Sequence, residues 1–309
     1  MPRRAILLIC LAIAPLVATA APDRASPGEA IAQGWSDPPP ISHYLARDGR
    51  RLAYRAYPGD GRVAILLHGS AGQSLFVHPL ARSLHATGAT VLAPDVRGHG
   101  ASGPRGDIDR IGQLEDDLAD LVVRVRRERP NARITLIGFS AGGAFALRAA
   151  GAPGGEAFDH VIALAPAFPF PSNVARPRTG GWARIDFPAM VLIGLANRMG
   201  IHAWDAHRVI AFAVPPDRAS GSTPAYSYRL AMNYSVGDYR AAAREMPQPL
   251  TVVAGVEDQQ FHAERYEAAL RPAKPDLRVR LVPGLDHTGL ITRPEGWAAV
   301  RTAFLDANP

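Results

Sequence analysis

Ser140 stands in a sequence pattern that can make a serine into a nucleophile. It is the centre of the turn 138–142 (Gly-Phe-Ser-Ala-Gly), which follows the apolar and β-branched stretch 134–137 and precedes the helix formers of 144–150. A strand, a G-x-S-x-G turn and a helix together form a nucleophile elbow. The two glycines let strand and helix approach closely, so that a strained serine projects its hydroxyl above the sheet edge. The alternative is a glycine-rich turn whose serine only caps the following helix.

A serine hydroxyl is a poor nucleophile at neutral pH, so this chemistry needs a base and a carboxylate that orients the base. The candidate base is His287, which follows the expected strand 277–282. Two carboxylates, Glu257 and Asp258, follow another expected strand, and either could orient the base. Asp286 is a local alternative, but adjacent side chains on a loop usually diverge.

Acyl transfer would also need hydrogen-bond donors for the negative charge that develops on the substrate's carbonyl oxygen. The backbone N–H of Ala141, the residue after the nucleophile, is expected to supply one donor. A second donor is expected from the glycine-containing loop that follows the expected strand 62–67. The residues alone leave open whether Ser70 or Ala71 supplies it.

Stretches typical of buried strands alternate with helical patterns along most of the chain. Strands are expected at 51–57, 62–67, 89–93, 134–137, 161–164, 250–254 and 277–282. This alternation predicts an α/β fold, with a mostly parallel sheet and helices on both faces. Between about 167 and 247 the alternation stops and Pro, Gly and aromatic residues are frequent, which indicates an insertion that caps the sheet. Its aromatic side chains either line an apolar wall for a substrate or form the insertion's own core.

The first 20 residues are expected to be a signal peptide rather than part of the fold. A pair of arginines precedes the apolar run 5–17, and a small-x-small cleavage pattern ends at Ala20. The run is shorter than the about 20 residues of a membrane span; an uncleaved N-terminal anchor is the alternative. Cleavage would remove Cys10, the only cysteine, so the mature protein would have no disulfides. The pattern therefore predicts a secreted or periplasmic protein without a stable membrane span. The Pro-rich stretch within 21–50 is expected to be an extended lead-in.

Composition and motifs exclude several other functions. The formal net charge is +6. The densest group of basic residues lies at the carboxyl end of a helical pattern, where the helix dipole favours cations. These charges therefore fit a solvated helix end, and no nucleic-acid binding is expected. No H-E-x-x-H motif occurs, and His202 and His207 do not have the spacing of metal ligands, so no metal is expected. The glycine patterns form neither a P-loop nor a dinucleotide fingerprint, so no cofactor is expected.

Five motifs follow one another along the chain and together suggest a family. They are His68-Gly69-Ser70-Ala71-Gly72, Asp95-Val96-Arg97-Gly98-His99-Gly100, the turn 138–142, Gly255-Val256-Glu257-Asp258 and Leu285-Asp286-His287. This series resembles the α/β-hydrolase superfamily, and within it the serine-aminopeptidase-like and lysophospholipase or monoacylglycerol-lipase-like branch. The resemblance implies an α/β-hydrolase domain over 51–309, with a lid insertion at about 167–247.

The resemblance also assigns roles that the residues alone left open. The Gly-x-x-Asp spacing selects Asp258 over Glu257 as the carboxylate of a catalytic triad. The same resemblance makes Ser70 the second donor beside Ala141 in an oxyanion hole. The chain order serine, aspartate, histidine is the order that this fold imposes.

Two further histidines in the motifs are expected to be structural. His68 lies before the glycine of the oxyanion turn and is interpreted as part of its framework. His99 is expected to brace its own turn together with Asp95 and Arg97, rather than to take part in catalysis.

These observations predict a secreted serine hydrolase that cleaves a small-molecule ester or acyl substrate through an acyl-enzyme, with Ser140, His287 and Asp258 as its triad. The first alternative is an aminopeptidase-type enzyme, whose insertion would need an acidic side chain to hold the amine of the substrate. The acidic residues available there are Asp186, Asp205, Asp217, Asp238 and Glu245. The second alternative is a non-catalytic binding protein on the same fold, but such proteins usually lose a triad member.

Overall fold

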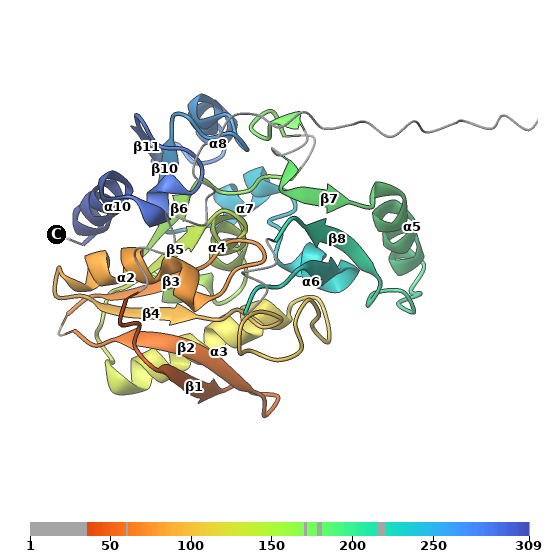
Figure 1. The fold of residues 1–309 in the computed structure, drawn as a ribbon, viewed down its shortest axis with the longest axis horizontal. Helices are drawn as coiled ribbons and strands as arrows, with labels where there is room; N and C mark the ends of the chain where they lie inside the picture. The colour runs from red at the N-terminus through yellow and green to blue at the C-terminus, as the bar shows by residue number, and fades with distance from the viewer. Residues whose placement is uncertain (1–35, 60, 170–171, 178–180, 215–220, 309) are drawn as a thin grey trace, which may run out of the picture.

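The computed structural model describes residues 36–59, 61–169, 172–177, 181–214 and 221–308. Its centre is an eight-stranded sheet with the strand order β1-β2-β4-β3-β5-β6-β10-β11 (Figure 1). The strands are β1 (Ile41–Leu45), β2 (Arg51–Tyr57), β3 (Val63–Leu67), β4 (Thr90–Pro94), β5 (Ile134–Phe139), β6 (His160–Leu164), β10 (Leu250–Gly255) and β11 (Arg278–Val282). The pairs β1–β2 and β2–β4 are antiparallel, and the remaining neighbours are parallel.

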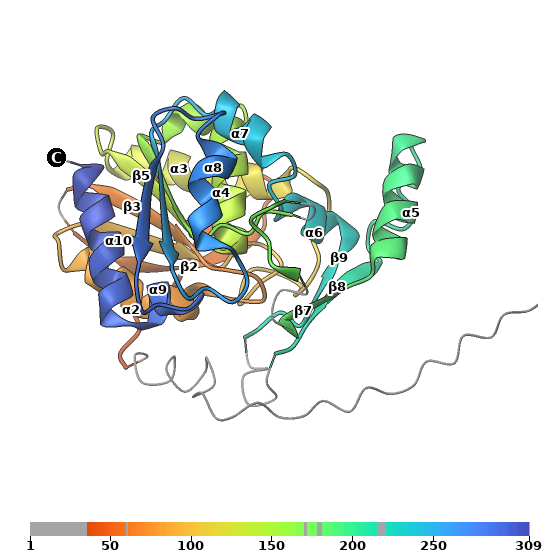
Figure 2. The ribbon, with the colours of Figure 1, turned by 90° about the horizontal axis from the view of Figure 1, so that it is seen from above.

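Helices cover both faces of this sheet, as the alternation of patterns predicts (Figure 2). One face carries α2 (His78–His85), α9 (Gly289–Thr292) and α10 (Pro294–Asp306), and the other carries α3 (Gln113–Glu128), α4 (Ala141–Gly151), α7 (Tyr239–Glu245) and α8 (Tyr266–Leu270). The central strand β3 shows why two layers are needed, since all five of its residues are buried. Its Ile65 packs in the cluster under α3 and α4, and its Leu66 packs in the cluster under α2 and α10.

Between β6 and β10 the chain leaves the main sheet and builds a second structure. Three short strands form an antiparallel sheet in the order β7-β8-β9. They are β7 (Ala183–Ile185), β8 (Arg208–Phe212) and β9 (Ala225–Ser227), and they are accompanied by α5 (Phe187–Arg198) and α6 (Tyr228–Asn233). These strands are not predicted from the sequence, because β7 and β9 have three residues each and β8 has one buried residue among its five. The role of this segment as a lid stays a prediction.

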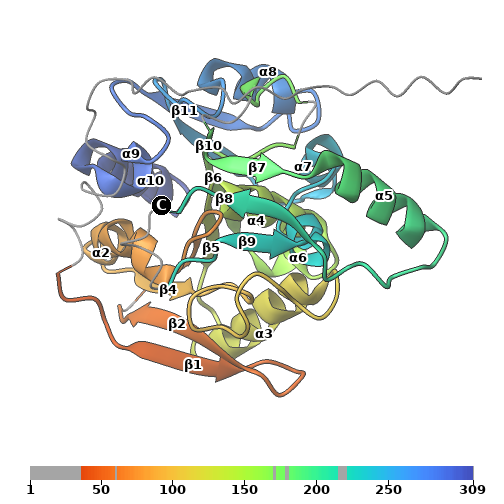
Figure 3. The same cartoon turned by 45° about the vertical axis from the view of Figure 1, so that its right-hand side comes forward.

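The aromatic residues of the insertion mostly pack inside the protein. Tyr226, Tyr228, Tyr234 and Tyr239 are all buried in the larger apolar cluster, whereas Trp204 is 55% exposed. Of the two interpretations given above, these four tyrosines fit a core, and they contribute to the contact between the insertion and the main sheet. Helix α5 instead stands away from the sheet (Figure 3), and several of its large apolar side chains are exposed.

The amino-terminal stretch contributes one strand to the sheet. Strand β1 lies within the range 21–50 that was expected to be a lead-in, and it pairs with β2 from Ile41↔Arg55 to Leu45↔Arg51. Only Tyr44 of this edge strand is buried, so its sequence shows little of the alternation by which strands are found. The predicted signal peptide lies outside the described residues. None of the described helices is long and apolar enough to cross a membrane.

Candidate active site

The carboxyl ends of the parallel strands bring three distant residues to one edge of the sheet. Ser140 directly follows β5, Asp258 lies in the loop after β10, and His287 lies in the loop after β11. Because β5, β6, β10 and β11 are parallel neighbours, the loops at their carboxyl ends open on the same side. Binding sites in open α/β sheets lie in this position.

The turn at Ser140 has the geometry of a nucleophile elbow. Ser140 has φ 53° and ψ −117°, a conformation outside the usual regions for a residue with a side chain. Its N–H donates to the Leu164 carbonyl at 2.8 Å, and its carbonyl accepts from the N–H groups of Ala144 and Ala167, each at 3.0 Å. The Ser140 side chain makes no capping hydrogen bond to α4, so the interpretation as a simple helix cap is wrong.

The two glycines of the elbow are required for steric reasons. A Cβ atom on Gly138 would lie 2.1 Å from the carbonyl oxygen of Gly142. A Cβ atom on Gly142 would lie 2.3 Å from the carbonyl oxygen of His68. Contacts this short with backbone atoms are not tolerated, so glycine at both positions allows β3, β5 and α4 to meet beneath the serine.

Ser140, His287 and Asp258 form one hydrogen-bonded chain. The Nε2 atom of His287 lies 3.0 Å from Oγ of Ser140, and its Nδ1 atom lies 2.8 Å from Oδ2 of Asp258. An ionised carboxylate can only accept, so the Nδ1–H of His287 donates to Asp258. The lone pair of Nε2 then faces the Ser140 hydroxyl, which donates to it. All three residues are buried.

The carboxylate of Asp258 is held in place by its own loop. Its Oδ1 atom accepts hydrogen bonds from the N–H groups of Gln260 at 2.7 Å and Phe261 at 2.9 Å, which leaves Oδ2 for His287. Neighbouring Glu257 is exposed, so it does not compete for this position.

The other local candidate, Asp286, has a different task. Its Oδ1 atom accepts from the N–H of Gly289 at 2.8 Å, at the start of α9. The His287 ring also contacts two aromatic rings, with its centroid 4.9 Å from that of Phe139 and 5.3 Å from that of Phe261. The imidazole is therefore packed against aromatic rings as well as hydrogen-bonded.

Two backbone N–H groups remain available next to the serine. Ala141 is the first residue of α4, and the first N–H groups of a helix have no partner within the helix. In the loop after β3, the N–H of Ala71 donates to the hydroxyl of Tyr226 at 2.7 Å. The Ser70 N–H has no acceptor among the residues that the structure describes. Of the two candidates that the residues left open, the geometry therefore favours Ser70.

The two histidines expected to be structural are hydrogen-bonded inside the framework of this loop. His68 accepts the N–H of Val96 at Nε2, at 3.2 Å, so its Nδ1–H donates to the carbonyl of Gly69 at 2.8 Å. His99 has Nδ1 3.1 Å from the carbonyl of Val96, and its Nε2 atom faces the hydroxyl of Tyr226. Burial lowers the pKa of both His68 and His99, so both rings are neutral.

Asp95 and Arg97 also have structural partners. The Asp95 carboxylate accepts the N–H groups of Ser74 at 2.6 Å and Ala101 at 2.8 Å. Arg97 donates through Nε and Nη2 to the carboxylate of Asp117 on α3, at 2.7 and 2.6 Å. These bonds tie the turn after β4 to neighbouring elements, as expected for bracing residues.

The acidic residues considered for binding a substrate amine mostly have partners within the insertion. Asp186 and Asp238 accept backbone N–H groups as the N-caps of α5 and α7. Asp205 accepts from the side-chain amide of Asn197 at 2.8 Å. Glu245 is exposed on α7, and Asp217 lies outside the described residues.

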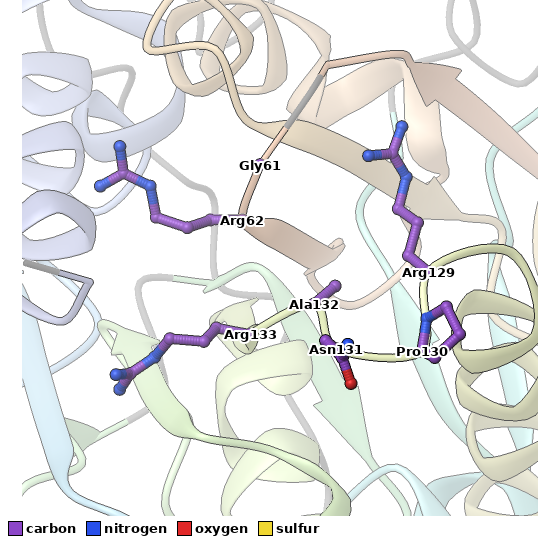
Figure 4. Close-up of a pocket in the computed structure, with 7 residues that line it drawn as sticks. All are labelled: Gly61, Arg62, Arg129, Pro130, Asn131, Ala132 and Arg133. Carbon is purple, nitrogen blue, oxygen red and sulfur yellow. The ribbon is translucent and has the colours of Figure 1, made fainter.

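Neither a metal site nor the pocket at the opposite end of the sheet competes with this site among the described residues. Among the described residues, no three His, Cys, Asp or Glu side chains group together in a way that could hold a metal ion. A pocket of about 480 Å³ lies beside the amino ends of β3 and β5, at the edge of the sheet opposite Ser140. Its lining includes Arg62, Arg129 and Arg133; in Figure 4 the side chains of Arg62 and Arg133 extend to the left and that of Arg129 extends upward. This pocket offers no nucleophile, and we do not assign the reaction to it.

Sequence reasoning missed the residues of the insertion that contact the loop after β3. Tyr226 binds Ala71, Tyr234 donates to the carbonyl of His68, and the Nε1–H of Trp182 donates to Oγ of Ser70 at 3.1 Å. The only available signal was the frequency of aromatic residues in this stretch. Pairing a tyrosine with a residue more than 150 positions away requires the three-dimensional fold.

Comparisons with known proteins agree with this architecture. A curated relative, the 2-(acetamidomethylene)succinate hydrolase of Mesorhizobium japonicum, is 26% identical over 86% of this chain and 96% of its own length. The monoacylglycerol lipase of Mycolicibacterium smegmatis is 27% identical over 77% of this chain and 86% of its own. The crystal structure of a soluble variant of the Saccharomyces cerevisiae monoglyceride lipase in complex with a substrate analogue shares the fold, with a TM-score of 0.65 and 15% identity over 89% of this chain and 96% of that chain.

The family follows from a match that covers most of the chain. Residues 60–292 match the family described as serine aminopeptidase, S33. The matched range extends from just before β3 to the end of α9, and so includes every residue of the hydrogen-bonded chain described above. The protein is therefore a hydrolase of the α/β-hydrolase superfamily and belongs to the serine aminopeptidase S33 family.

Proposed function

We propose that the protein is a serine hydrolase that cleaves carboxylic esters through an acyl-enzyme. The observation that carries this proposal is the continuous hydrogen-bonded chain from Ser140 through His287 to Asp258. A serine in an elbow, an imidazole and a buried carboxylate in this order are the parts needed to generate a serine nucleophile.

Each residue has a defined step in the proposed reaction. Oγ of Ser140 attacks the substrate carbonyl carbon while Nε2 of His287 takes its proton, and the negative charge of Asp258 stabilises the imidazolium. The N–H groups of Ser70 and Ala141 stabilise the oxyanion of the tetrahedral intermediate. The imidazolium then protonates the leaving alkoxide, and a water molecule activated by the same base hydrolyses the acyl-enzyme.

The substrate class rests on the relatives and on the composition of the insertion. Two similar proteins are lipases for monoacylglycerol or monoglyceride. A small-molecule acyl ester is the substrate that fits both these names and the aromatic side chain of Trp182, which lies beside Ser70. The interactions of Asp186, Asp205 and Asp238 within the insertion leave an aminopeptidase-type amine site without support from these three residues.

The proposal includes export of the protein. The amino-terminal pattern ending at Ala20 supports a cleaved signal peptide and a secreted or periplasmic location. The intact mass of the protein recovered from the periplasm and the medium tests this. A mature chain that begins at Ala21 supports export with cleavage, whereas a full-length chain in the membrane fraction supports the uncleaved anchor.

The activity is tested with a series of p-nitrophenyl esters from acetate to palmitate, using the wild type and Ser140→Ala side by side. By the precedent of another serine hydrolase, loss of the nucleophile lowers turnover about a millionfold. Amino-acid p-nitroanilides serve as the parallel substrate series. Cleavage of the anilides without cleavage of the esters would contradict the ester proposal, and equal rates in both proteins would contradict the assignment of Ser140.

A further inference from the structure

The turn that would carry the oxyanion hole is held from the insertion on both sides of Ala71. The Ala71 N–H donates to the Tyr226 hydroxyl at 2.7 Å, and the Ala71 carbonyl accepts the N–H of Thr223 at 3.0 Å. The hydroxyl of Tyr234 donates to the carbonyl of His68, at the start of the same loop. Residues more than 150 positions away in the sequence therefore fix the loop that follows β3.

Tyr226 connects this turn to a second fixed point. Its hydroxyl oxygen accepts the Ala71 N–H, so its O–H donates to Nε2 of His99 at 2.6 Å. The Nδ1–H of His99 in turn points to the carbonyls of Val96 and Arg97, at 3.1 and 3.2 Å. Every polar atom along this path has a partner, and burial raises the pKa of Tyr226, so the phenol keeps its proton.

The conformation of Ala71 explains why the turn needs an external bond. Gly72 N–H donates to the Gly69 carbonyl at 3.1 Å, which closes a turn with Ser70 and Ala71 at its centre. Ala71 has φ +58°, the left-handed conformation that favours glycine at this position of a turn. An alanine there is strained, and such strain persists only where the surroundings fix the backbone. The bonds to Tyr226 and Thr223 provide that restraint.

The Ser70 N–H is the group whose direction depends on this restraint. This N–H lies in the Gly69–Ser70 peptide, next to the Ser70–Ala71 peptide that carries the Ala71 N–H. A change in the backbone dihedral angles at Ala71 therefore also changes the direction of the Ser70 N–H. We propose that Tyr226 is a positioning residue, which aims the Ser70 N–H at the oxyanion by holding Ala71 against His99. This inference rests on the proposed function, because it assigns a role within the oxyanion hole of that reaction.

The test is Tyr226→Phe, which keeps the buried ring and removes only the hydroxyl. Tyr228→Phe is the matched control, because Tyr228 is buried in the same short segment and has no hydrogen bond to the loop after β3. The final extent of labelling by a fluorophosphonate counts competent sites in each protein, and kcat is expressed per competent site. Ser140→Ala is assayed in parallel on the same ester.

A displaced oxyanion donor affects the transition state and not the bound substrate, so Tyr226→Phe is expected to lower kcat about 10- to 100-fold with KM nearly unchanged. Affinity for a boronic acid, which mimics the tetrahedral intermediate, is expected to fall by a similar factor, while affinity for the carboxylate product stays the same. Tyr228→Phe is expected to stay within about twofold of the wild type.

Three results would overturn the inference. The first is a kcat of Tyr226→Phe within twofold of the wild-type value, and the second is an equal loss of kcat in Tyr226→Phe and Tyr228→Phe. The third is a loss of affinity in Tyr226→Phe that is equal for the boronic acid and the carboxylate. If Ser140→Ala retained full activity, the proposed function itself would fail. If Ser140→Ala lost its activity while the kcat of Tyr226→Phe stayed unchanged, only the role proposed for Tyr226 would be contradicted.

Discussion

The Oγ atom of Ser140 lies 3.0 Å from the Nε2 atom of His287, although the two residues are 147 positions apart in the sequence. The contact exists because β5 and β11 end at the same edge of the sheet, separated by β6 and β10. The elbow fixes the serine by its backbone, and Asp258 fixes the imidazole by its side chain. The proposed chemistry therefore depends on three loops and on the strand order that places them.

Replacing the carboxylate of Asp258 by an amide is expected to remove most activity without unfolding the protein. In Asp258→Asn the amide oxygen can still accept the N–H groups of Gln260 and Phe261, so the amide nitrogen faces His287. A donor at that position favours the wrong tautomer of the imidazole, and kcat is expected to fall by about 10⁴.

Asp286→Asn provides the control for this substitution, because Asp286 bonds to Gly289 at the start of α9 and not to the imidazole. Its ester turnover is expected to stay near the wild-type value. Steady-state kinetics on one p-nitrophenyl ester measures both variants. Similar losses in the two variants would contradict the choice of Asp258 as the orienting carboxylate.

The buried ion pair between Arg97 and Asp117 is expected to be important for stability. Both side chains are almost fully buried, and Asp117→Asn would leave the Arg97 guanidinium with only the half-exposed Asp48 and the distant Asp109 as charged partners. Breaking a buried pair on one side typically costs about 3–5 kcal/mol, so the free energy of unfolding is expected to fall by an amount of this order.

Urea unfolding measures this difference, with Asp120→Asn as the matched control on the same helix. Asp120 pairs with Arg47, whose side chain is 52% exposed, and exposed pairs contribute at most about 1 kcal/mol. A loss in Asp117→Asn no larger than in Asp120→Asn would show that the pair does not hold the turn after β4 to α3.

Buried His160 is expected to make the protein less stable in mild acid. Burial lowers the pKa of His160 from 6.5 to about 4, with a smaller contribution from the positive charges of Arg278 and Arg133. Between these two pH values the unfolded chain binds a proton that the folded chain does not, so the free energy of unfolding falls as the pH falls from 6.5 to about 4.

His160→Gln tests this, because glutamine can keep a hydrogen bond to Thr251, the partner of His160 Nε2 at 3.0 Å, without taking up a proton. The free energy of unfolding of the variant is expected to fall less than that of the wild type over this pH range. His68 and His99 still contribute to the pH dependence in both proteins. His43→Gln, on the exposed side of β1, is the control. Parallel curves of unfolding free energy against pH for the wild type and His160→Gln would contradict the prediction.

Much of the fold could be predicted from the sequence because its central strands are buried runs between clear turns. The strands β3, β5 and β10 and the elbow at Ser140 each have a local signal within a few residues. Strand β1 escaped prediction because an edge strand with one buried side chain shows little alternation. The strands of the insertion are too short to be recognised by period.

The candidate site divides in the same way. Ser140 and His287 lie in motifs that follow strands, so their positions could be inferred from strand order. The choice of Asp258 over Glu257 came instead from the Gly-x-x-Asp spacing of the resembled family. Tyr226 has no such motif, because its partner Ala71 is brought to it by the packing of the insertion on the main sheet. The choice between Ser70 and Ala71 likewise needed the contact that occupies the Ala71 N–H.

The assignment of the nucleophile is tested most directly by the site at which a fluorophosphonate attaches to the protein. The wild type, Ser140→Ala and Ser70→Ala are incubated with the reagent, and the modified peptide is identified by mass spectrometry. One adduct per chain is expected, on Ser140, with no labelling of Ser140→Ala and full labelling of Ser70→Ala. An adduct on any other residue, or labelling that persists in Ser140→Ala, would contradict the assignment of Ser140 as the nucleophile.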